Sequence, residues 1–369
     1  MIDFTSNTLQ QSSVQNWVSQ LLAEQGMDAG LYVELPDAWF AAWEHMAYQP
    51  VFASRSTLEY QKAYLEGAGN QAIDISLVLR SDGRPVGLLP LSLSRTNSWQ
   101  LTTMGAPISA PMFVKGLSLR TEKKLCTGVL SLLKRLASDL GQKTLLTEQA
   151  YWPIELRGCT EWHQQLMSAG AGIQTRHDLF ADLHPDLVAI RSTFRKSYKP
   201  LINVALKAWQ ADIMDADNAD ANTWAEFKQL HKDVTGRSTR ADSTWVLQWG
   251  MILSRSAFLV TLRDPEDQRL VGAGLFQFTR DEGLYAVGAY DRSLFDKPLG
   301  HAVQQRAIET LKTLGVRWYQ VGERHYSRSS HSPSAKEVAI SEFKQGFSSH
   351  MFCRYQFTLS YSSDRLIQQ

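Results

Sequence analysis

The sequence predicts a mixed α/β protein of the α+β type, built from two domains that each combine a mostly antiparallel sheet with flanking helices. Two observations support this fold class. The chain has 369 residues, which is long for one domain and enough for two that each bury a core. The order helix, hairpin, strand, loop, helix and strand also occurs twice along the chain. This repetition predicts two copies of one unit.

Composition predicts an ordinary globular protein, with 44% hydrophobic and 20% charged residues. The 38 basic and 37 acidic side chains leave a net charge of +1, so no overall field selects nucleic acid or an anionic membrane, and any phosphate site has to be local. No apolar run approaches the roughly 20 residues of a membrane span. Residues 1–20 lack the basic start of a signal peptide. The odd count of distant cysteines argues against disulfides. We therefore expect a cytoplasmic location. The cysteines are Cys126, Cys159 and Cys353.

The first domain is predicted to span residues 31–190, after an N-terminal helical extension over residues 1–30. Apolar runs at residues 73–79 and 85–94 flank the tetrad Ser-Asp-Gly-Arg at positions 81–84, which is a hairpin signal. Residues 123–140 repeat Leu and Val at helical spacing, which predicts an amphipathic helix.

The second domain is predicted to span residues 191–369 and to carry the active site. Its patterns follow the same order as those of the first domain. They predict helices at residues 224–230, 244–254 and 302–314, and strands at residues 258–263, 271–278, 283–289 and 316–321.

The loop before helix 302–314 has the features of an anion site. Pro298 suits the first turn of a helix, Gly300 allows close approach of another molecule, and the first amides of a helix have no internal partner. We assign Lys297, Gly300 and Ala302 to the phosphate or pyrophosphate of a donor. His301 is either a helix-start residue or a catalytic group.

Two clusters of cations are candidates for binding a substrate anion. Residues 190–209 are predicted as one basic helix, in which Arg195 and Lys199 hold a diphosphate or carboxylate of the acceptor, unless the charges form a solvated face. Arg237 and Arg240 lie in a polar loop and either clamp an anionic group or serve solubility.

The remaining candidates follow the strands of the second domain. Glu323 accepts a proton in this hypothesis, the charge of Lys344 stabilises the developing oxyanion, and Tyr290 protonates the leaving group. The alternatives are a packed tyrosine and a surface lysine. Arg324 and Lys336 are further candidates for substrate binding. His325 and His331 lie in a Ser-rich loop without partners at metal-ligand spacing, so no metal centre is expected.

Several of these segments resemble the second domain of the FemAB family, within the broad GNAT acyltransferase superfamily. They are Tyr290-Asp291, Pro298 with its helix, residues 319–322 (Tyr-Gln-Val-Gly) and residues 343–347 (Phe-Lys-Gln-Gly-Phe). Residues 297–302 are also similar to the GNAT pyrophosphate loop, with Lys in place of the usual first residue. The resemblance implies two GNAT-like domains and places Lys344 facing the substrate.

The resemblance implies transfer of an acyl or aminoacyl group to an amine. We therefore expect an N-acyltransferase whose co-substrate is acyl-CoA or aminoacyl-tRNA, with no tightly bound cofactor. The expected acceptor is a small-molecule amine on a nucleotide-linked or lipid-linked sugar of a cell-envelope or glycan precursor. The alternative is a non-catalytic duplicated module that binds a sugar nucleotide or a protein partner.

Overall fold

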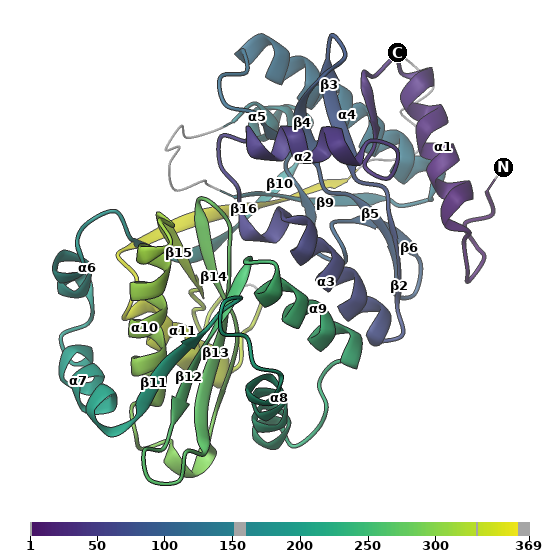
Figure 1. Ribbon diagram of the computed structural model, residues 1–369. Coiled ribbons are helices and arrows are strands. Elements are labelled where there is room, and N and C mark those ends of the chain that lie inside the picture. Colours follow the sequence, from purple (N-terminus) through teal and green to yellow (C-terminus); the bar gives the residue numbers. More distant parts are fainter. Residues whose placement is uncertain (1, 151–159, 330, 361–369) are drawn as a thin grey trace. The chain divides into compact units, whose positions relative to one another are not determined.

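The computed structural model describes residues 2–150, 160–329 and 331–360 (Figure 1), so Cys159 lies outside the described residues. The chain divides into two compact units. The first comprises residues 1–48, 61–176 and 353–369, and the second residues 49–60 and 177–352. This division differs from the predicted boundaries, because a short N-terminal segment joins the second unit and the C-terminal strand joins the first. The chain passes between the units within three elements: α3 (Arg55–Gly67), β10 (Gly172–Asp182) and β16 (His350–Ser360).

The first unit is a mixed α/β domain with one contiguous core. Residues 1–30 are part of it, since α1 (Gln11–Glu24) buries Val14, Val18 and Leu21 in that core. Its strands pair in the orders β1-β3-β4-β8 and β2-β5-β6, and β9 pairs with both β7 and β16. The other elements are α2 (Pro36–Glu44), α4 (Leu119–Asp139), α5 (Glu161–Ser168), β1 (Ala29–Leu31), β2 (Gln71–Asp74), β3 (Leu77–Ser81), β4 (Arg84–Leu89), β5 (Ser92–Arg95), β6 (Trp99–Thr102), β7 (Ile108–Ser109), β8 (Met112–Phe113) and β9 (Thr144–Ala150).

The predicted hairpin is confirmed: β3 and β4 pair antiparallel, with Ser81 opposite Arg84. Asp82 and Gly83, between them, have φ of 53° and 76°, the left-handed backbone that a two-residue turn requires. The flanking apolar runs are each divided between two strands of different sheets. The predicted helix 123–140 is confirmed as α4, whose cap Ser118 accepts a hydrogen bond from the amide of Thr121.

The second unit is built on a sheet with the strand order β11-β12-β13-β14-β15-β10. All its neighbours are antiparallel except β14 and β15. The strands are β11 (Gln210–Met214), β12 (Ala257–Arg263), β13 (Leu270–Phe278), β14 (Glu282–Tyr290) and β15 (Trp318–Glu323), and the helical segments are η1 (Val51–Ala53), α6 (Leu187–Thr193), α7 (Tyr198–Ala208), α8 (Ala221–Thr235), α9 (Asp242–Leu253), η2 (Arg292–Leu294), α10 (Leu299–Thr313) and α11 (Ala335–Gln345).

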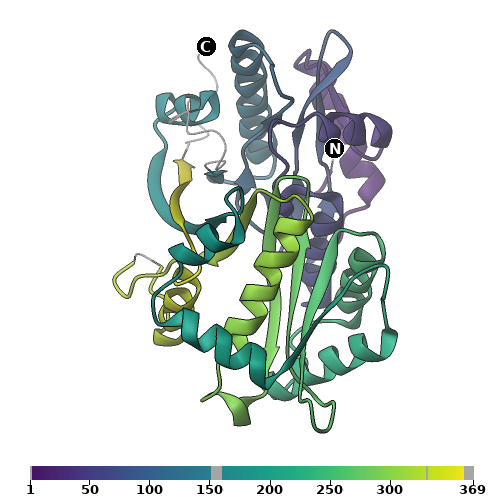
Figure 2. The ribbon, with the colours of Figure 1, turned by 60° about the vertical axis from the view of Figure 1, so that its left-hand side comes forward.

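Alternation along β12 gives this sheet two buried faces. Phe258 and Val260 pack in a cluster with α7 and α10, whereas Ala257 and Leu259 pack in a second cluster with α8 and α9. Figure 2 shows α10 lying along the sheet with α7 beside it. The N-terminal end of α10 therefore lies on the face of the sheet that α7 also covers.

The predicted basic helix over residues 190–209 is wrong, because it is two helices, α6 and α7. The break starts at Phe194, whose ψ of 151° is extended. Next to it the amide of Arg195 donates to the carbonyl of Gly346, so a tertiary hydrogen bond replaces the helical one. No helix in the described part of the chain is long and apolar enough to cross a bilayer.

Candidate functional site

The candidate site lies where two parallel strands of the second unit separate. β14 pairs with β15 only over its first three residues, Glu282 to Leu284. A bulge follows in β14, since Leu275 and Phe276 of β13 face Val287 and Tyr285. Residues 284–288 are partly exposed although β14 is an inner strand. The divergence of the strands thus leaves backbone and side chains of a central strand accessible.

Three tyrosines occupy this region: Tyr319 is fully buried, and Tyr285 and Tyr290 are partly buried. The hydroxyls of Tyr285 and Tyr290 lie 3.0 Å apart in a hydrogen bond, and the hydroxyl of Tyr319 donates to Gln304 Oε1 at 2.5 Å. Burial raises the pKa of Tyr285, and it raises the pKa values of Tyr290 and Tyr319 well above the ordinary value. All three phenols therefore stay protonated at neutral pH and can act as proton or hydrogen-bond donors.

Lys344, in the last turn of α11, reaches the same region. Its side chain passes Gly322, where a Cβ would lie 2.7 Å from Nζ, and Nζ stands 5.4 Å from the ring centre of Tyr285. Within the described residues the ammonium has no hydrogen bond or ion pair. Burial lowers the pKa of Lys344. A cation without a carboxylate partner, held against an aromatic ring, is available to a negatively charged group.

The start of α10 completes this cluster. Pro298 caps the helix without a side-chain hydrogen bond. The amides of Leu299 and His301 donate to the carbonyls of Lys297 and Pro298, so among these first three amides that of Gly300 is the one left, within the described residues, to another partner. A Cβ on Gly300 would lie 3.1 Å from Phe343 and 3.8 Å from Tyr290, so Gly300 is next to both. Lys297 is exposed and pairs with Asp296 at 3.0 Å. Ala302 is fully buried and contributes backbone only.

His301 is enclosed by aromatic rings. Its ring centre lies 4.5 Å from that of Tyr198 and 5.1 Å from that of Phe343, and its Nε2 has no hydrogen-bond partner among the residues that the structure describes. Burial lowers the pKa of His301 to about 4, so the imidazole is neutral at physiological pH.

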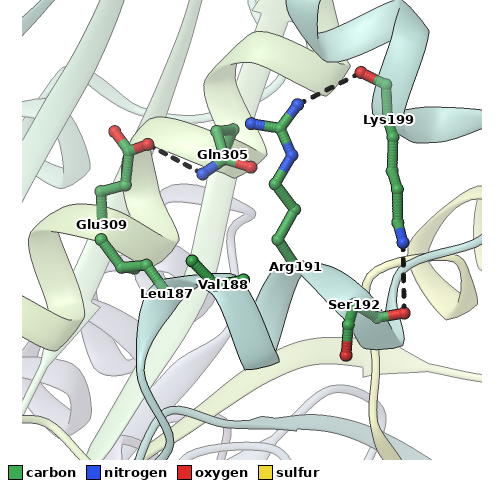
Figure 3. Close-up of a pocket in the computed structure, with 7 residues that line it drawn as sticks. All are labelled: Leu187, Val188, Arg191, Ser192, Lys199, Gln305 and Glu309. Carbon is green, nitrogen blue, oxygen red and sulfur yellow. Dashed lines mark hydrogen bonds between the residues drawn. The ribbon is translucent and has the colours of Figure 1, made fainter.

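The cations predicted to bind the acceptor have different surroundings. Figure 3 shows Lys199 and Arg191 on a shallow hollow of about 390 Å³, where Lys199 Nζ donates to the carbonyl of Ser192 at 3.5 Å. The same hollow is lined by Glu309 and by apolar side chains of α6. Arg195 instead donates to the carbonyl of Glu342 at 3.2 Å, which ties α7 to α11.

Arg237 and Arg240 lie between α8 and α9, the helices of the opposite sheet face, and are not brought to the Lys344 cluster. Arg240 stacks on Trp245, with its guanidinium carbon 3.7 Å from the ring centre, and donates to the Tyr60 hydroxyl at 2.8 Å. Arg237 is exposed. The packing of Arg240 indicates a structural role in place of the predicted substrate contact.

Arg324 is also committed to the protein. Its guanidinium donates to Gln345 Oε1 at 2.9 Å, to Ser341 Oγ at 2.9 Å and to Glu342 Oε1 at 3.1 Å, so it fastens the end of β15 to α11. Lys336 is exposed in the first turn of α11, eight residues before Lys344 and therefore roughly 12 Å away along the helix. Neither is placed beside the Lys344 ammonium.

Glu323 lies at the end of β15, with Oε1 3.6 Å from His325 Nδ1, and His325 Nδ1 lies 3.1 Å from His331 Nε2. Sequence spacing predicted no partners for these histidines at metal-ligand distance. That prediction is wrong, because the loop folds back and gives the two histidines nearby partners. One ligand atom from each of Glu323, His325 and His331 lies within 4.8 Å of the others.

The sequence matches no known family and no curated protein. Solved structures do match over almost the whole chain. FemX aligns with a TM-score of 0.62 and 12% identity over 98% of this chain and 99% of its own. L-PGS from Bacillus licheniformis aligns with a TM-score of 0.51 and 12% identity over 95% and 93%. A C-terminal domain from Agrobacterium fabrum, described as that of a lysylphosphatidylglycerol synthetase, aligns with a TM-score of 0.57 and 10% identity over 89% and 93%.

The chain has a FemAB-like, GNAT-related fold. Its mixed α/β architecture, in two compact units, agrees with the fold class that the sequence predicted. Because the identities lie between 10% and 12%, these likenesses describe the fold, and the chemistry has to be argued from the residues of this chain.

Sequence reasoning missed three residues of the FemAB-like fold's candidate site: Tyr285, Tyr319 and Gln304. Gln304 is fully buried, and its Nε2 has no hydrogen-bond partner. Tyr285 and Tyr319 look like ordinary apolar strand positions in the sequence, and Gln304 looks like a polar helix position. The one available signal was Gln304, since it lies three residues before Ala307 and seven before Leu311, on the face of the helix predicted to be buried.

Proposed function

We propose that the chain is an N-acyltransferase that transfers an acyl or aminoacyl group from an activated donor to an amine. The observation that carries the proposal is the position of Lys344. Its ammonium, which has no hydrogen bond or ion pair within the described residues, stands beside the ring of Tyr285 at the divergence of β14 and β15, in the same cluster as Gly300 at the start of α10. Negative charge develops on the carbonyl oxygen and on the leaving group during acyl transfer, and this arrangement supports both.

The reaction assigns a role to each group. The neutral amine of the acceptor attacks the acyl carbon, and the carbonyl π bond opens to an oxyanion that Lys344 stabilises through its charge. The oxyanion then re-forms the carbonyl while the bond to the leaving sulfur or oxygen breaks, and the leaving group takes a proton from the Tyr285–Tyr290 pair. The attacking nitrogen gives its extra proton back to that pair, so the amide forms neutral and both phenols end protonated. Burial raises the pKa values of both phenols, so they are protonated at neutral pH and the proton is present when the leaving group departs.

The donor is acyl-CoA or aminoacyl-tRNA. Both carry phosphates, and the amide of Gly300 at the start of α10 offers a local contact for one of them. The near-neutral net charge of +1 favours the smaller donor, because tRNA binding usually needs a broad basic surface. Saturable coenzyme A binding supports this donor, and salt-sensitive tRNA retention supports the other.

The acceptor in this proposal is an amine on a nucleotide-linked or lipid-linked sugar of a cell-envelope or glycan precursor. The hollow lined by Lys199 and Arg191 combines two cations with apolar contacts from Leu187 and Val188 (Figure 3). Such a surface fits an anionic group that carries an apolar or ring-shaped neighbour.

Lys344→Met tests the proposal, because it removes the charge and keeps the length of the side chain. Glycan and nucleotide-sugar pools are compared by mass spectrometry in cells that lack the protein and carry either variant. Losing an oxyanion partner costs about 100- to 1000-fold in rate, so Lys344→Met leaves the acylated product missing. The control, Lys336→Met, restores it. Full restoration by Lys344→Met would remove Lys344 from the chemistry.

One observation favours a second candidate function, a non-catalytic binding module. Phe343 lies directly over Gly300 and partly covers the start of α10. In that case both Lys344→Met and Lys336→Met restore the pools, and Lys199→Ala with Arg191→Ala does not. The two candidates therefore give opposite results in one experiment.

A further inference from the structure

A cluster of metal-ligand side chains lies at the end of β15, outside the tyrosine and lysine cluster. Glu323 is the last residue of the strand, His325 follows two positions later, and His331 returns along the loop that leads to α11. One carboxylate oxygen and two imidazole nitrogens lie within 4.8 Å of one another. Glu323 and His325 are both partly buried, with side-chain exposures of 21% and 23%. The three ligand atoms therefore converge on one small volume that solvent can reach.

We propose that Glu323, His325 and His331 bind a divalent transition-metal ion of the Zn²⁺ class. Two imidazoles and one carboxylate form a ligand set that suits Zn²⁺ and leaves a fourth position open. In a tetrahedral zinc site with bonds of about 2.0–2.1 Å, neighbouring ligand atoms stand roughly 3.3 Å apart. The separations of 3.1 Å between His325 Nδ1 and His331 Nε2, and of 3.6 Å between His325 Nδ1 and Glu323 Oε1, lie on either side of that value.

The backbone around two of the ligands is fixed before any metal binds. The amide of His325 donates to Ser341 Oγ at 3.1 Å, and the guanidinium of Arg324 donates to the same oxygen at 2.9 Å. Glu323 lies in a strand paired with β10, opposite Asp178. A site held by neighbouring elements loses little entropy on binding its ion. The metal would join the end of β15 to the loop that enters α11.

The ligand set also argues against other ions. Ca²⁺ takes six to eight oxygen ligands and Mg²⁺ prefers an octahedron of oxygens, whereas this cluster has two nitrogens and one carboxylate. The inference gives Glu323 a ligand role in place of the proton-acceptor role expected from the sequence. It does not rest on the proposed acyl transfer, which uses Lys344 and the tyrosines.

The test uses the full chain after treatment with EDTA and desalting. Calorimetric titration with Zn²⁺ should show one saturable site per chain, Co²⁺ should give the visible absorption spectrum of a low-symmetry four-coordinate ion, and Mg²⁺ should not compete. His331→Ala and His325→Ala should each weaken Zn²⁺ binding by at least about tenfold. Mutating a residue that only hydrogen-bonds to a metal ligand already costs this much affinity, so loss of a ligand itself should cost no less. His184→Ala, at an exposed position outside the cluster, should bind as the wild type does.

The competing outcome is an imidazole–imidazole hydrogen bond only. In that case the wild type takes up no Zn²⁺, or His331→Ala binds it equally well, and the proposal is overturned. A second measurement covers a variant that folds poorly. Zn²⁺ should raise the melting temperature of the wild type and of His184→Ala, and that of Glu323→Gln by much less. An equal rise in all three would also overturn it. None of these measurements depends on transferase activity.

Discussion

Gly322 determines whether Lys344 can cross from α11 to the tyrosines. Its φ of 151° is a backbone conformation that residues with a Cβ rarely adopt, and a Cβ there would stand 2.7 Å from Lys344 Nζ and 2.8 Å from Cδ. Gly322→Ala therefore has two effects. The backbone strain costs about 1–3 kcal/mol of folding free energy. Lys344 also has to move by about 1 Å to regain ordinary contact distances of about 3.5–4.0 Å.

The two effects can be separated with a double-mutant cycle. Lys344→Ala removes Cδ, Cε and Nζ, so in that background Gly322→Ala should cost only the backbone strain. The free-energy penalty of Gly322→Ala should therefore fall by at least about 0.5 kcal/mol. Urea unfolding followed by tryptophan fluorescence measures all four variants. Equal penalties in both backgrounds would show that Lys344 does not lie across Gly322, and the proposed site would lose its cation.

Three further predictions test the surroundings of the site and the fold. The unfolded chain protonates His301 near pH 6.5 and the folded chain only near pH 4, so lowering the pH between these values favours unfolding. The melting temperature of His301→Phe should therefore fall less from pH 7 to pH 4 than that of the wild type. Equal falls in melting temperature would contradict the burial of His301. Gly300→Ala should weaken binding of the donor. The free energy of unfolding should change by less than about 1 kcal/mol, because Ala improves helix propensity and Phe343 has to shift by only a few tenths of an ångström. Unchanged affinity for both coenzyme A and charged tRNA would exclude α10 as the donor site. Gly83→Ala should destabilise the first unit by about 1–2 kcal/mol in thermal unfolding. No atom would clash with the added Cβ, but a φ of 76° is strained for Ala. Unchanged stability would contradict the left-handed turn.

Short sequence patterns correctly predicted those elements that are stabilised by residues close to one another in the chain. The hairpin turn at Asp82 and Gly83 has a turn signal between apolar runs, and α4 and α10 have apolar residues at helical spacing. The break before α7 was not predictable in this way. It depends on the hydrogen bond from Arg195 to Gly346, which is about 150 positions away in the sequence. The paired residues of β16 and β9 are even farther apart in the sequence.

The residues of the candidate site also fall into two groups, those indicated by the sequence and those that only the fold brings together. The sequence indicated Lys344, Tyr290 and Gly300, and the structure brings them into one cluster, although their catalytic and binding roles stay predictions. Tyr285 and Gln304 escaped because their polar ends gain importance only when strands and helices assemble around them. The histidines of the loop after β15 escaped for a related reason, since five residues separate His325 from His331 and only the fold of the loop brings their rings together.

Competitive acetylation of lysines, analysed by mass spectrometry of the peptides, tests the central claim most directly. Trace acetic anhydride labels Lys344 and the exposed Lys336 of the same helix, first without a donor, then with coenzyme A and then with charged tRNA. If Lys344 faces the donor, one of the two donors protects it while the labelling of Lys336 stays constant. Equal labelling of Lys344 under all three conditions would contradict the placement of acyl transfer at the divergence of β14 and β15.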